Sequence, residues 1–539
     1  MKENQIKQII RNMTKEEMVG QLFCLEYKKN RTYEENERLI KKIKPGGFFV
    51  AGVSEGEIKE LTETANSYTN IPVIIAADVE NGPGHAVPGE TKLPYPMAWG
   101  ACDDCNLIKN AHRLTAEICR KMGIHWTFSP IVDINMNFNN PVVNVRAISD
   151  SPKQVAKIAR AAVEGLQEKG CMAATCKHFP GDGVDDRNQH FCTTVNSLSK
   201  EKWSKTFGYV YREMIDADAA SVMVGHIALP AFDTKLNEWY GYPPATLSRN
   251  IITGLLRNTL GFKGCIVSDA LSMIGASAAA AQREIATKFI NAGGDMLLFP
   301  LEEYYDNILE DVQNGIISEE RLQDAVFHVL QLKNRVRLLD DNISARDISD
   351  AAGDIAEIGE EIAEKSLNIV RDIDGILPLK LKKGSKILLL NICKDKTEDK
   401  VWFRCGLDTL ESELNKRGFK TKKIVNAKIT EFREEAEDAD AVLINCKISS
   451  NDYLGGTLRI TSSHIGPFWR GAVLQWKNVI FTSFGDPYKI YDFPYIKTYI
   501  NAFSANESSQ RAFVKALFGE IPFCGKSPVR LEGFYESDF

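Results

Sequence analysis

Eight short apolar segments, rich in β-branched and aromatic residues, recur along the first part of the chain. Most of the intervals between them carry apolar residues at steps of three and four, which is the spacing of an amphipathic helix. The eight segments are residues 21–27, 46–52, 73–80, 126–134, 172–179, 221–229, 264–272 and 295–300. Eight alternations of strand and helix predict an α/β fold, a (β/α)8 TIM-like barrel of ordinary size.

A second α/β region follows the barrel pattern. Beyond about residue 302 come helices and then a charged stretch that is typical of a linker. Apolar segments at 386–392, 440–446 and 478–485 look like parallel strands separated by helices. We therefore expect a catalytic barrel over residues 1–345, a linker helix over 346–365 and a smaller αβα sandwich domain over 366–539.

Composition narrows the class of protein. A net charge of −6 without a long basic block argues against a nucleic-acid partner. The polar N-terminal segment lacks the apolar core of a signal peptide, and no apolar run reaches the length of a membrane span. We expect a cytoplasmic protein without membrane contact, whose twelve cysteines, including the pair Cys102 and Cys105, are reduced structural thiols.

Polar residues gather where the predicted barrel strands end. The segment KHFPGDGVDDRNQH, residues 177–190, follows a short apolar strand and begins with two basic side chains before a Pro-Gly turn. The carboxyl ends of the strands carry the chemistry in α/β barrels. Three other strand ends also place polar side chains there: Asp78 after the third strand, Asn144 and Arg146 after the fourth, and Asp269 after the seventh.

These residue types suit a reaction on a polyol. Hydroxyl groups need rigid donors and acceptors, which are supplied by Asp78, Arg146, Lys177 and His178. Asp269 is left to attack an electrophilic carbon. His190 can move a proton, because an unperturbed imidazole has a pKa of about 6.5. A carboxylate nucleophile with a separate acid/base is the equipment of double-displacement glycoside cleavage.

The chain resembles glycoside hydrolase family 3, in the branch of the β-N-acetylglucosaminidases. The family motif is similar to KHFPG-x-G followed by D-x-H, and its nucleophile lies in an [ST]-D-x-L-x-M context, which residues 268–273 match. The similarity extends to residues 13–23, 140–152 and 244–264 and to the C-terminal region.

The resemblance implies a retaining, exo-acting enzyme that removes terminal β-linked N-acetylhexosamine from small cell-wall or chitin fragments. It implies that Asp269 is the nucleophile and His190 the acid/base. The sugar would be held by Asp78, Arg146, Lys177 and His178. The resemblance also implies that no metal and no organic cofactor is needed. The expected partner is a small carbohydrate substrate.

The chain departs from the family pattern in two places. The family's D-x-H reads Asn188-Gln189-His190, and an amide can orient an imidazole without carrying the charge that stabilises its protonated form. The acid/base should therefore be weaker, or Asp185 or Asp186 could substitute for it. In addition, residues 77–85 lack the arginines that often follow in the family, which makes an anionic muropeptide a less supported substrate.

Two other functions stay open. The first is a β-glycoside phosphorylase or a β-glucosidase of the same family, because an uncharged Asn188 would not repel an incoming phosphate. The second is a catalytically impaired sugar-binding protein, against which the retention of Asp269 and His190 argues. The oligomeric state and any contact of the second domain with substrate are also open.

Three further side-chain predictions concern histidines. His226 could be a hydrogen-bonded barrel histidine or could line the pocket, and His464 is expected at the surface of the second domain. A metal site built from His178, His190, Asp182 and Asp186 is not expected, because their spacing is irregular and Lys177 is adjacent.

Overall fold

The protein folds into two compact units. The computed structural model describes all residues except 240, 340–350, 394–405, 428–431, 450–458 and 461–475, so the expected linker is described only in part and His464 not at all. The barrel unit consists of Met1–Thr91, Ile108–Asn137 and Val155–Ile355. The sandwich unit consists of Lys92–Leu107, Phe138–Gln154 and Ala356–Phe539.

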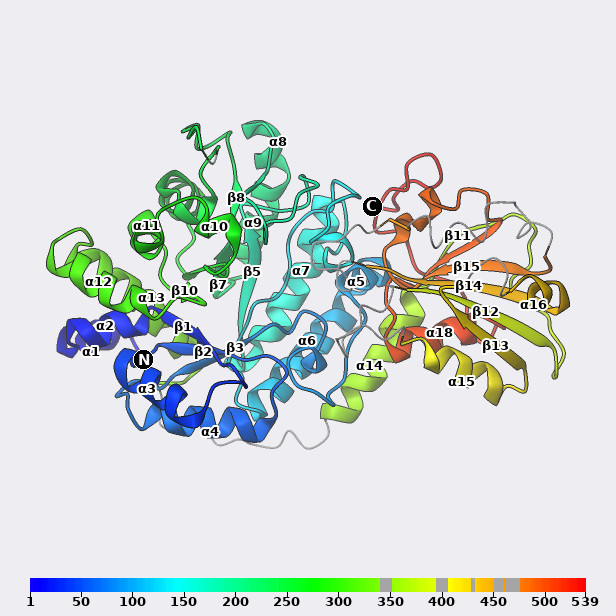
Figure 1. Ribbon diagram of the computed structural model, residues 1–539, viewed down its shortest axis with the longest axis horizontal. Helices are drawn as coiled ribbons and strands as arrows, with labels where there is room; N and C mark the ends of the chain where they lie inside the picture. The colour runs from blue at the N-terminus through cyan, green and yellow to red at the C-terminus, as the bar shows by residue number, and fades with distance from the viewer. Residues whose placement is uncertain (240, 340–350, 394–405, 428–431, 450–458, 461–475) are drawn as a thin grey trace. The chain divides into compact units, whose positions relative to one another are not determined.

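Eight parallel strands form the barrel in the order β10-β1-β2-β3-β4-β5-β7-β9 (Figure 1). A parallel bridge between Val267 and Met296 joins the two ends of this order, so the barrel is nearly closed. Every one of the eight predicted segments contains one of these barrel strands, which confirms the predicted fold class. The strands are β1 Phe23–Glu26, β2 Gly47–Phe49, β3 Ile74–Ala77, β4 Trp126–Thr127, β5 Ala173–Phe179, β7 Ser221–Val224, β9 Cys265–Ser268 and β10 Leu297–Leu298.

Two short strands lie beyond the carboxyl ends of β5 and β7. β6 Thr194–Val195 pairs in parallel with β8 Ile227–Ala228. The chain after β5 is therefore held alongside the chain after β7, and this pairing supports the long polar loop that carries residues 180–193.

Helices follow most barrel strands, and several begin at capping boxes. Thr14, Thr32 and Ser54 each accept a hydrogen bond from the backbone of a glutamate three residues later, which satisfies one free N–H group of the first turn. The helices that precede and follow these strands are α1 Glu3–Asn12, α2 Lys15–Gln21, α3 Tyr33–Ile43, α4 Glu55–Asn66, α6 Cys105–Lys121, α7 Pro152–Gln167, α8 Lys200–Lys205, α9 Phe207–Asp216, the π-helix η5 Asn250–Thr259, α10 Ile274–Ser277, α11 Ile285–Ala292, α12 Glu303–Gln313 and α13 Glu319–Arg335.

Large apolar side chains fill the barrel. Phe49 and Phe128 stack with their ring centroids 5.8 Å apart, and Trp126 meets Phe128 edge to face at 4.8 Å. All three are buried, as expected for the interior of a barrel of this size. No helix among the described residues combines the length and the apolar character that crossing a membrane requires.

The sandwich unit is built on a six-stranded sheet in the order β11-β16-β15-β14-β12-β13. The three strands predicted from the sequence are β12 Lys386–Cys393, β14 Ala441–Lys447 and β15 Val479–Ser483, and they are parallel neighbours. Three strands were not predicted: β11 Asn368–Asp372, β13 Lys420–Val425 and β16 Thr498–Asn501. β11 runs antiparallel to β16, and the other pairs are parallel.

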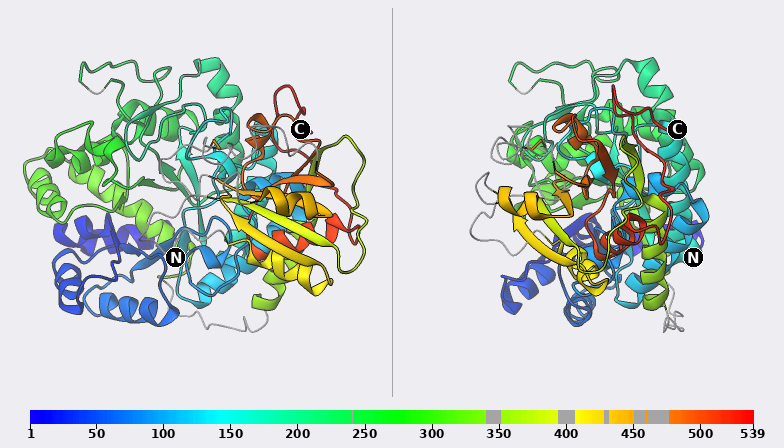
Figure 2. Two further views of the ribbon diagram at one scale, coloured as in Figure 1. Left: turned by 45° about the vertical axis from the view of Figure 1, so that its right-hand side comes forward. Right: turned by 90° about the vertical axis from the view of Figure 1, so that its right-hand side faces the viewer.

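Helices cover both faces of this sheet, as Figures 1 and 2 show. Leu389 and Leu443 share one face and belong to a core with residues of α15 Asp408–Lys416 and α18 Glu507–Leu517. Leu390 and Ile444 belong to the core of the other face, with residues of α5 Pro96–Cys102 and α16 Arg433–Asp438. The unit is therefore an αβα sandwich. Another helix, α14 Ala351–Ser366, lies mostly within this unit.

Two insertions from between the barrel strands belong to the sandwich unit. Residues 92–107, after β3, and residues 138–154, after β4, group with it. Met97 and Val145 explain this grouping, because both are fully buried in the core that contains Leu390 and Ile444. Among the described residues, the 3-10 helices are η1 Pro83–His85, η2 Asn144–Arg146, η3 Glu168–Gly170, η4 Ala245–Leu247, η6 Gln282–Glu284 and η11 Pro487–Tyr491.

Candidate active site

The carboxyl ends of three barrel strands bring most of the predicted site residues to one rim. Asp78 follows β3, Lys177 and His178 lie near the carboxyl end of β5, and Asp269 follows β9. His190 lies on the loop after β5. Because the strands are parallel, these residues share the end of the barrel at which barrel enzymes carry their active sites.

Lys177 is held between two carboxylates. Its Nζ lies 2.8 Å from Oδ1 of Asp78 and 2.8 Å from Oε1 of Glu80, and the lysine side chain is almost completely buried. A buried ammonium group needs such counter-charges. Sequence reasoning missed Glu80, although its position two residues after Asp78, on the same side of an extended chain, was a usable signal. The pair of carboxylates fixes the position of the ammonium group at the barrel mouth.

His178 is oriented by a buried aspartate. Its Nδ1 donates to Oδ2 of Asp133 over 2.7 Å, and its backbone N–H donates to Oδ1 of the same carboxylate over 3.1 Å. Because an ionised carboxylate only accepts, Nδ1 carries the proton in this arrangement. Sequence reasoning also missed Asp133, which is fully buried in the otherwise apolar segment 126–134. An isolated charge in such a segment was the available signal.

The glycines of the 177–190 loop allow it to pack closely on the chain that carries Asp133. Gly183 has a φ angle of +102°, and a Cβ atom there would lie 2.1 Å from the carbonyl oxygen of Ile134. The backbone N–H of Asp182 donates to Oδ1 of Asp133 over 2.8 Å. The loop and the histidine thus depend on the same buried carboxylate.

Asn188 bonds to His190 through one oxygen. Its Oδ1 lies 2.6 Å from Nδ1 of the imidazole and accepts the backbone N–H of His190 over 2.9 Å. An amide oxygen only accepts, so Nδ1 carries the ring proton and Nε2 is the nitrogen that can exchange a proton with a ligand. Among the described residues, Nδ2 of the buried Asn188 meets no hydrogen-bond partner.

The loop that carries His190 is fixed from two neighbouring strand ends. The buried Gln189 accepts the backbone N–H of His226 through its Oε1 over 3.2 Å, and His226 follows β7. After β9, the backbone N–H of Ile274 donates to the carbonyl oxygen of His190 over 3.2 Å. A Cβ atom on Gly275 would lie 2.5 Å from the carbonyl oxygen of Gln189, so this close approach requires glycine.

Asp269 is a buried carboxylate among histidines. Burial by itself raises the pKa of Asp269, but the charges of His178, His226 and His190 outweigh it, together with a hydrogen bond from the backbone N–H of Ala270, and the net pKa is lowered. That hydrogen bond to Oδ1 is 2.8 Å long. Asp269 is therefore ionised near neutral pH and can act as a nucleophile or as an electrostatic partner of a cationic centre.

His226 completes the surroundings of Asp269. Its Nδ1 lies 2.8 Å from Oγ1 of Thr246 and its Nε2 lies 3.0 Å from the carbonyl oxygen of Ala270. Burial lowers the pKa of His226, and the nearby charge of Asp269 opposes this shift in part. With both ring nitrogens bonded, His226 fits the first of its two predicted roles, a hydrogen-bonded barrel histidine.

Asp185 forms an ion pair with Arg187. Its carboxylate accepts hydrogen bonds from Nε of Arg187 over 3.0 Å and from Nη2 over 2.6 Å. It also accepts one from the backbone N–H of Val195 over 2.7 Å. Burial raises the pKa of Asp185, but these hydrogen bonds and the charge of Arg187 lower it overall. A carboxylate stabilised in its ionised form is a poor proton donor, so Asp185 is less suited than His190 to act as acid.

Arg146 lies on η2 in the sandwich unit. Its Nη1 donates to the carbonyl oxygen of Val142 over 3.1 Å. Its role as a sugar ligand stays a prediction.

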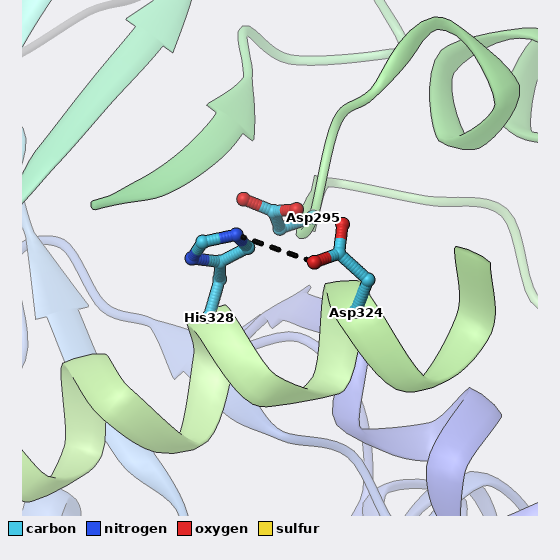
Figure 3. A group of neighbouring side chains, drawn as sticks. All are labelled: Asp295, Asp324 and His328. Atoms are coloured by element: carbon cyan, nitrogen blue, oxygen red, sulfur yellow. Dashed lines mark ion pairs between the residues drawn. The ribbon is translucent and has the colours of Figure 1, made fainter. Parts of the chain in front are cut away.

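The described residues contain one cluster with the composition of a metal site, and it lies away from the barrel mouth. Asp295 precedes β10, and Asp324 and His328 lie one turn apart on α13 (Figure 3). Both oxygens of Asp295 accept hydrogen bonds from guanidinium groups, those of Arg257 and Arg321. Two guanidinium charges on the central carboxylate disfavour a cation, so we interpret the cluster as a structural ion-pair network.

A nearly closed (β/α)8 barrel with a buried ionised carboxylate, three imidazoles and a fixed ammonium group at its mouth defines a class of barrel enzymes that act on small polar substrates. Residues 14–332 match the family model described as "Glycosyl hydrolase family 3 N terminal domain". The chain belongs to glycosyl hydrolase family 3, and the protein is a glycoside hydrolase.

Individual relatives agree with this assignment. The chain is 30% identical over 548 residues to a β-N-acetylglucosaminidase/β-glucosidase of Cellulomonas fimi, covering 97% of this chain and 95% of the relative. It is 32% identical over 253 residues to a β-hexosaminidase of Nitrosomonas eutropha, covering 46% of this chain and 70% of the relative.

Solved structures match the chain over almost its whole length. A β-glucoside phosphorylase, BglX, bound to 2FGlc has a TM-score of 0.85 and 28% identity, covering 98% of this chain and 96% of that one. A β-N-acetylglucosaminidase from Paenibacillus sp. str. FPU-7 has a TM-score of 0.84 and 27% identity, covering 96% of this chain and 99% of that one. These similarities confirm the predicted family and fold.

Proposed function

We propose that this protein is a retaining, exo-acting β-N-acetylglucosaminidase that removes terminal β-linked N-acetylhexosamine from small glycosides such as cell-wall or chitin fragments. The observation that carries the proposal is the buried carboxylate of Asp269, whose pKa is lowered by the surrounding histidines against the effect of burial. The similarity to β-N-acetylglucosaminidases and β-hexosaminidases supports the choice of sugar.

In the first step a carboxylate oxygen of Asp269 bonds to the anomeric carbon while the bond from that carbon to the leaving oxygen breaks. His190, protonated at Nε2, gives this proton to the leaving oxygen, and a glycosyl ester of Asp269 remains. In the second step His190 takes a proton from water at Nε2. The resulting hydroxide oxygen bonds to the anomeric carbon, the ester bond breaks, and Asp269 leaves as a carboxylate. The configuration at the anomeric carbon is therefore retained.

The remaining residues hold the sugar. Lys177 presents an ammonium group whose position is fixed by Asp78 and Glu80, and His178 presents an imidazole fixed by Asp133. Rigid donors favour one orientation of the sugar hydroxyls and so reduce the entropy lost on reaching the transition state. Arg146 is the fourth proposed ligand of the sugar.

The test is a panel of 4-nitrophenyl glycosides followed by trapping of the intermediate. The proposal expects the highest kcat/KM with the β-N-acetylglucosaminide and covalent labelling of Asp269 by a mechanism-based fluorosugar. Labelling of Asp78 or Asp185, or cleavage of the β-glucoside alone, would contradict it.

A second candidate is phosphorolysis of the same bond. Asn188 places an uncharged oxygen 2.6 Å from the His190 ring, so no anion at that position repels a phosphate nucleophile. One of the similar solved structures is a β-glucoside phosphorylase. Assays with and without inorganic phosphate separate the two functions, because only a phosphorylase releases sugar 1-phosphate.

We further propose that the enzyme acts in the cytoplasm. Eleven cysteines lie among the described residues, and all are free thiols, which suits a reducing compartment. An activity measured in fractionated cells decides this point.

A further inference from the structure

Two exposed apolar side chains flank the loop position of His190. Phe191 is 54% exposed and Ile274 is 49% exposed, whereas the two residues before His190, Asn188 and Gln189, are buried. In this loop two polar side chains are buried and an aromatic side chain is exposed, whereas polar side chains are mostly exposed in folded proteins. An exposed aromatic or aliphatic side chain beside a residue that acts on the substrate can bind the apolar part of that substrate.

The Phe191 ring contacts the ring of His190, and the backbone of Ile274 is bonded to the backbone of His190. The ring centroid of Phe191 lies 6.4 Å from that of His190, with the planes inclined at 52°. The backbone N–H of Phe191 donates to the carbonyl oxygen of Asn188 over 3.0 Å, and that of Ile274 donates to the carbonyl oxygen of His190 over 3.2 Å. The Phe191 ring therefore has a defined place relative to the imidazole, and the backbone of Ile274 is fixed beside that of His190.

We propose that Phe191 and Ile274 form the binding surface for the leaving group of the substrate, and that it accepts leaving groups with a flat apolar face, such as a second pyranose ring or an aryl ring. This inference rests on the proposed function. His190 must reach the glycosidic oxygen to protonate it, so the part of the substrate beyond that oxygen lies next to the residues that flank His190.

The chemistry of the two side chains fits such an occupant. The C–H groups on one face of a pyranose are apolar, and an aromatic ring binds such a face or another aromatic ring favourably. Ile274 adds apolar contact without a hydrogen-bonding demand. The surface therefore selects the shape of the leaving group while the sugar is selected by Lys177, His178 and their neighbours.

The test compares three substrates that share one N-acetylglucosamine unit. The β-fluoride has no ring in its leaving group and needs little protonation. The 2,4-dinitrophenyl glycoside has a ring and also needs little protonation. N,N′-diacetylchitobiose has a ring and needs a proton from the acid. Comparison of the first two isolates ring binding, and His190→Ala defines the pattern expected when only proton donation is lost.

The proposal expects Phe191→Ala to lower kcat/KM for both ring-bearing substrates by about three- to tenfold, the range of one aromatic contact. The fluoride should change by less than about twofold on the same scale. Phe191→Tyr should keep the wild-type pattern, and Ile274→Ala should show a smaller loss of the same kind. Tyr33→Ala is the matched control, because Tyr33 is also 54% exposed in the barrel unit and lies at the start of α3.

Three results would overturn the inference. A loss confined to the disaccharide, as in His190→Ala, would show that Phe191 positions the imidazole. An equal loss on all three substrates would show a structural role, and no loss would show that the ring faces only solvent. If the wild-type enzyme cleaves none of the three substrates, the proposed function itself fails and this inference falls with it. If the wild-type enzyme cleaves the fluoride but Phe191→Ala and Ile274→Ala affect ring-bearing substrates no more than the fluoride, this inference alone is refuted.

Discussion

Asp133 binds His178 through both of its carboxylate oxygens, one to the ring Nδ1 at 2.7 Å and one to the backbone N–H at 3.1 Å. The aspartate is fully buried and comes from the chain after β4, while the histidine comes from the end of β5. This pairing fixes both the tautomer and the orientation of the imidazole before any substrate binds.

We expect Asp133→Asn to disturb His178 without removing it. Three donors face this carboxylate, two from His178 and the backbone N–H of Asp182. An amide has only one acceptor oxygen, so its NH₂ group opposes at least one of them. Partners that orient a metal-bound histidine change activity by about 10- to 100-fold, and we expect a loss of the same order for this buried partner of His178. Steady-state kinetics with the N-acetylglucosaminide should show this loss in kcat/KM. Unchanged kinetics in a folded variant would show that His178 does not need its buried partner.

Asp269→Ala should reduce turnover by several orders of magnitude, because the variant cannot form the glycosyl ester. The thermal midpoint should change little, since the side chain accepts one backbone hydrogen bond at the rim of the barrel. The measurement is kcat with an activated aryl glycoside, together with a melting curve. Turnover within about tenfold of wild type would exclude Asp269 as nucleophile.

Lys177→Ala should lower kcat/KM by roughly two to three decades, because a charged hydrogen bond made in the transition state is worth about 2–4 kcal/mol. Glu80→Gln tests the second carboxylate beside Lys177, which the sequence analysis did not identify. It should keep the ammonium group but weaken its placement, and so give a smaller loss than Lys177→Ala. A fully active Lys177→Ala variant would show that this lysine supports only the loop.

Asn188→Asp should strengthen the protonated form of His190. An anion at hydrogen-bond distance from the ring favours the charged imidazole, so the pKa of the group that controls the alkaline limb of the pH profile should rise. Substrates with poor leaving groups should be cleaved faster, and activated aryl glycosides should change little in their glycosylation step. An unchanged pH profile and leaving-group dependence would remove His190 as the proton donor.

Lys333 predicts a pH-dependent stability. Burial lowers the pKa of Lys333 to about 7, and Nζ donates to Oε1 of Gln21 over 2.7 Å. In the unfolded chain the group has a pKa of about 10.4. Between these values the unfolded state binds more protons, so stability rises with pH by up to about 1.4 kcal/mol per pH unit.

Lys333→Met should therefore stabilise the barrel most below pH 7, and the gain should shrink towards pH 10. The difference in unfolding free energy between variant and wild type, measured at several pH values, gives the answer. The exposed Lys121→Met serves as control and should show no such slope. A constant difference for Lys333→Met across this range would mean that the buried amine is not the titrating group.

The local sequence pattern was sufficient to predict the barrel strands and most of the helices between them. Each barrel strand is a short apolar run bounded by turns, and the helices between them carry their own periodicity and caps, so short-range sequence sufficed to place them. The residues at the strand ends were also readable, because a parallel barrel brings consecutive strand ends to one rim. Asp78, Lys177, His178 and Asp269 were found in this way.

Tertiary structure alone decided the partners of these residues. Glu80 and Asp133 bind side chains from another strand, and Gln189 binds the backbone N–H of His226. A hydrogen bond between distant segments leaves no periodic trace in the sequence. The same holds for residues 92–107 and 138–154, which group with the sandwich unit because Met97 and Val145 are buried in its core. β13 escaped prediction because an edge strand such as Lys420–Val425 has a polar, partly exposed pattern. Local propensity and periodicity place elements, but only the packing of the folded chain determines which side chains meet.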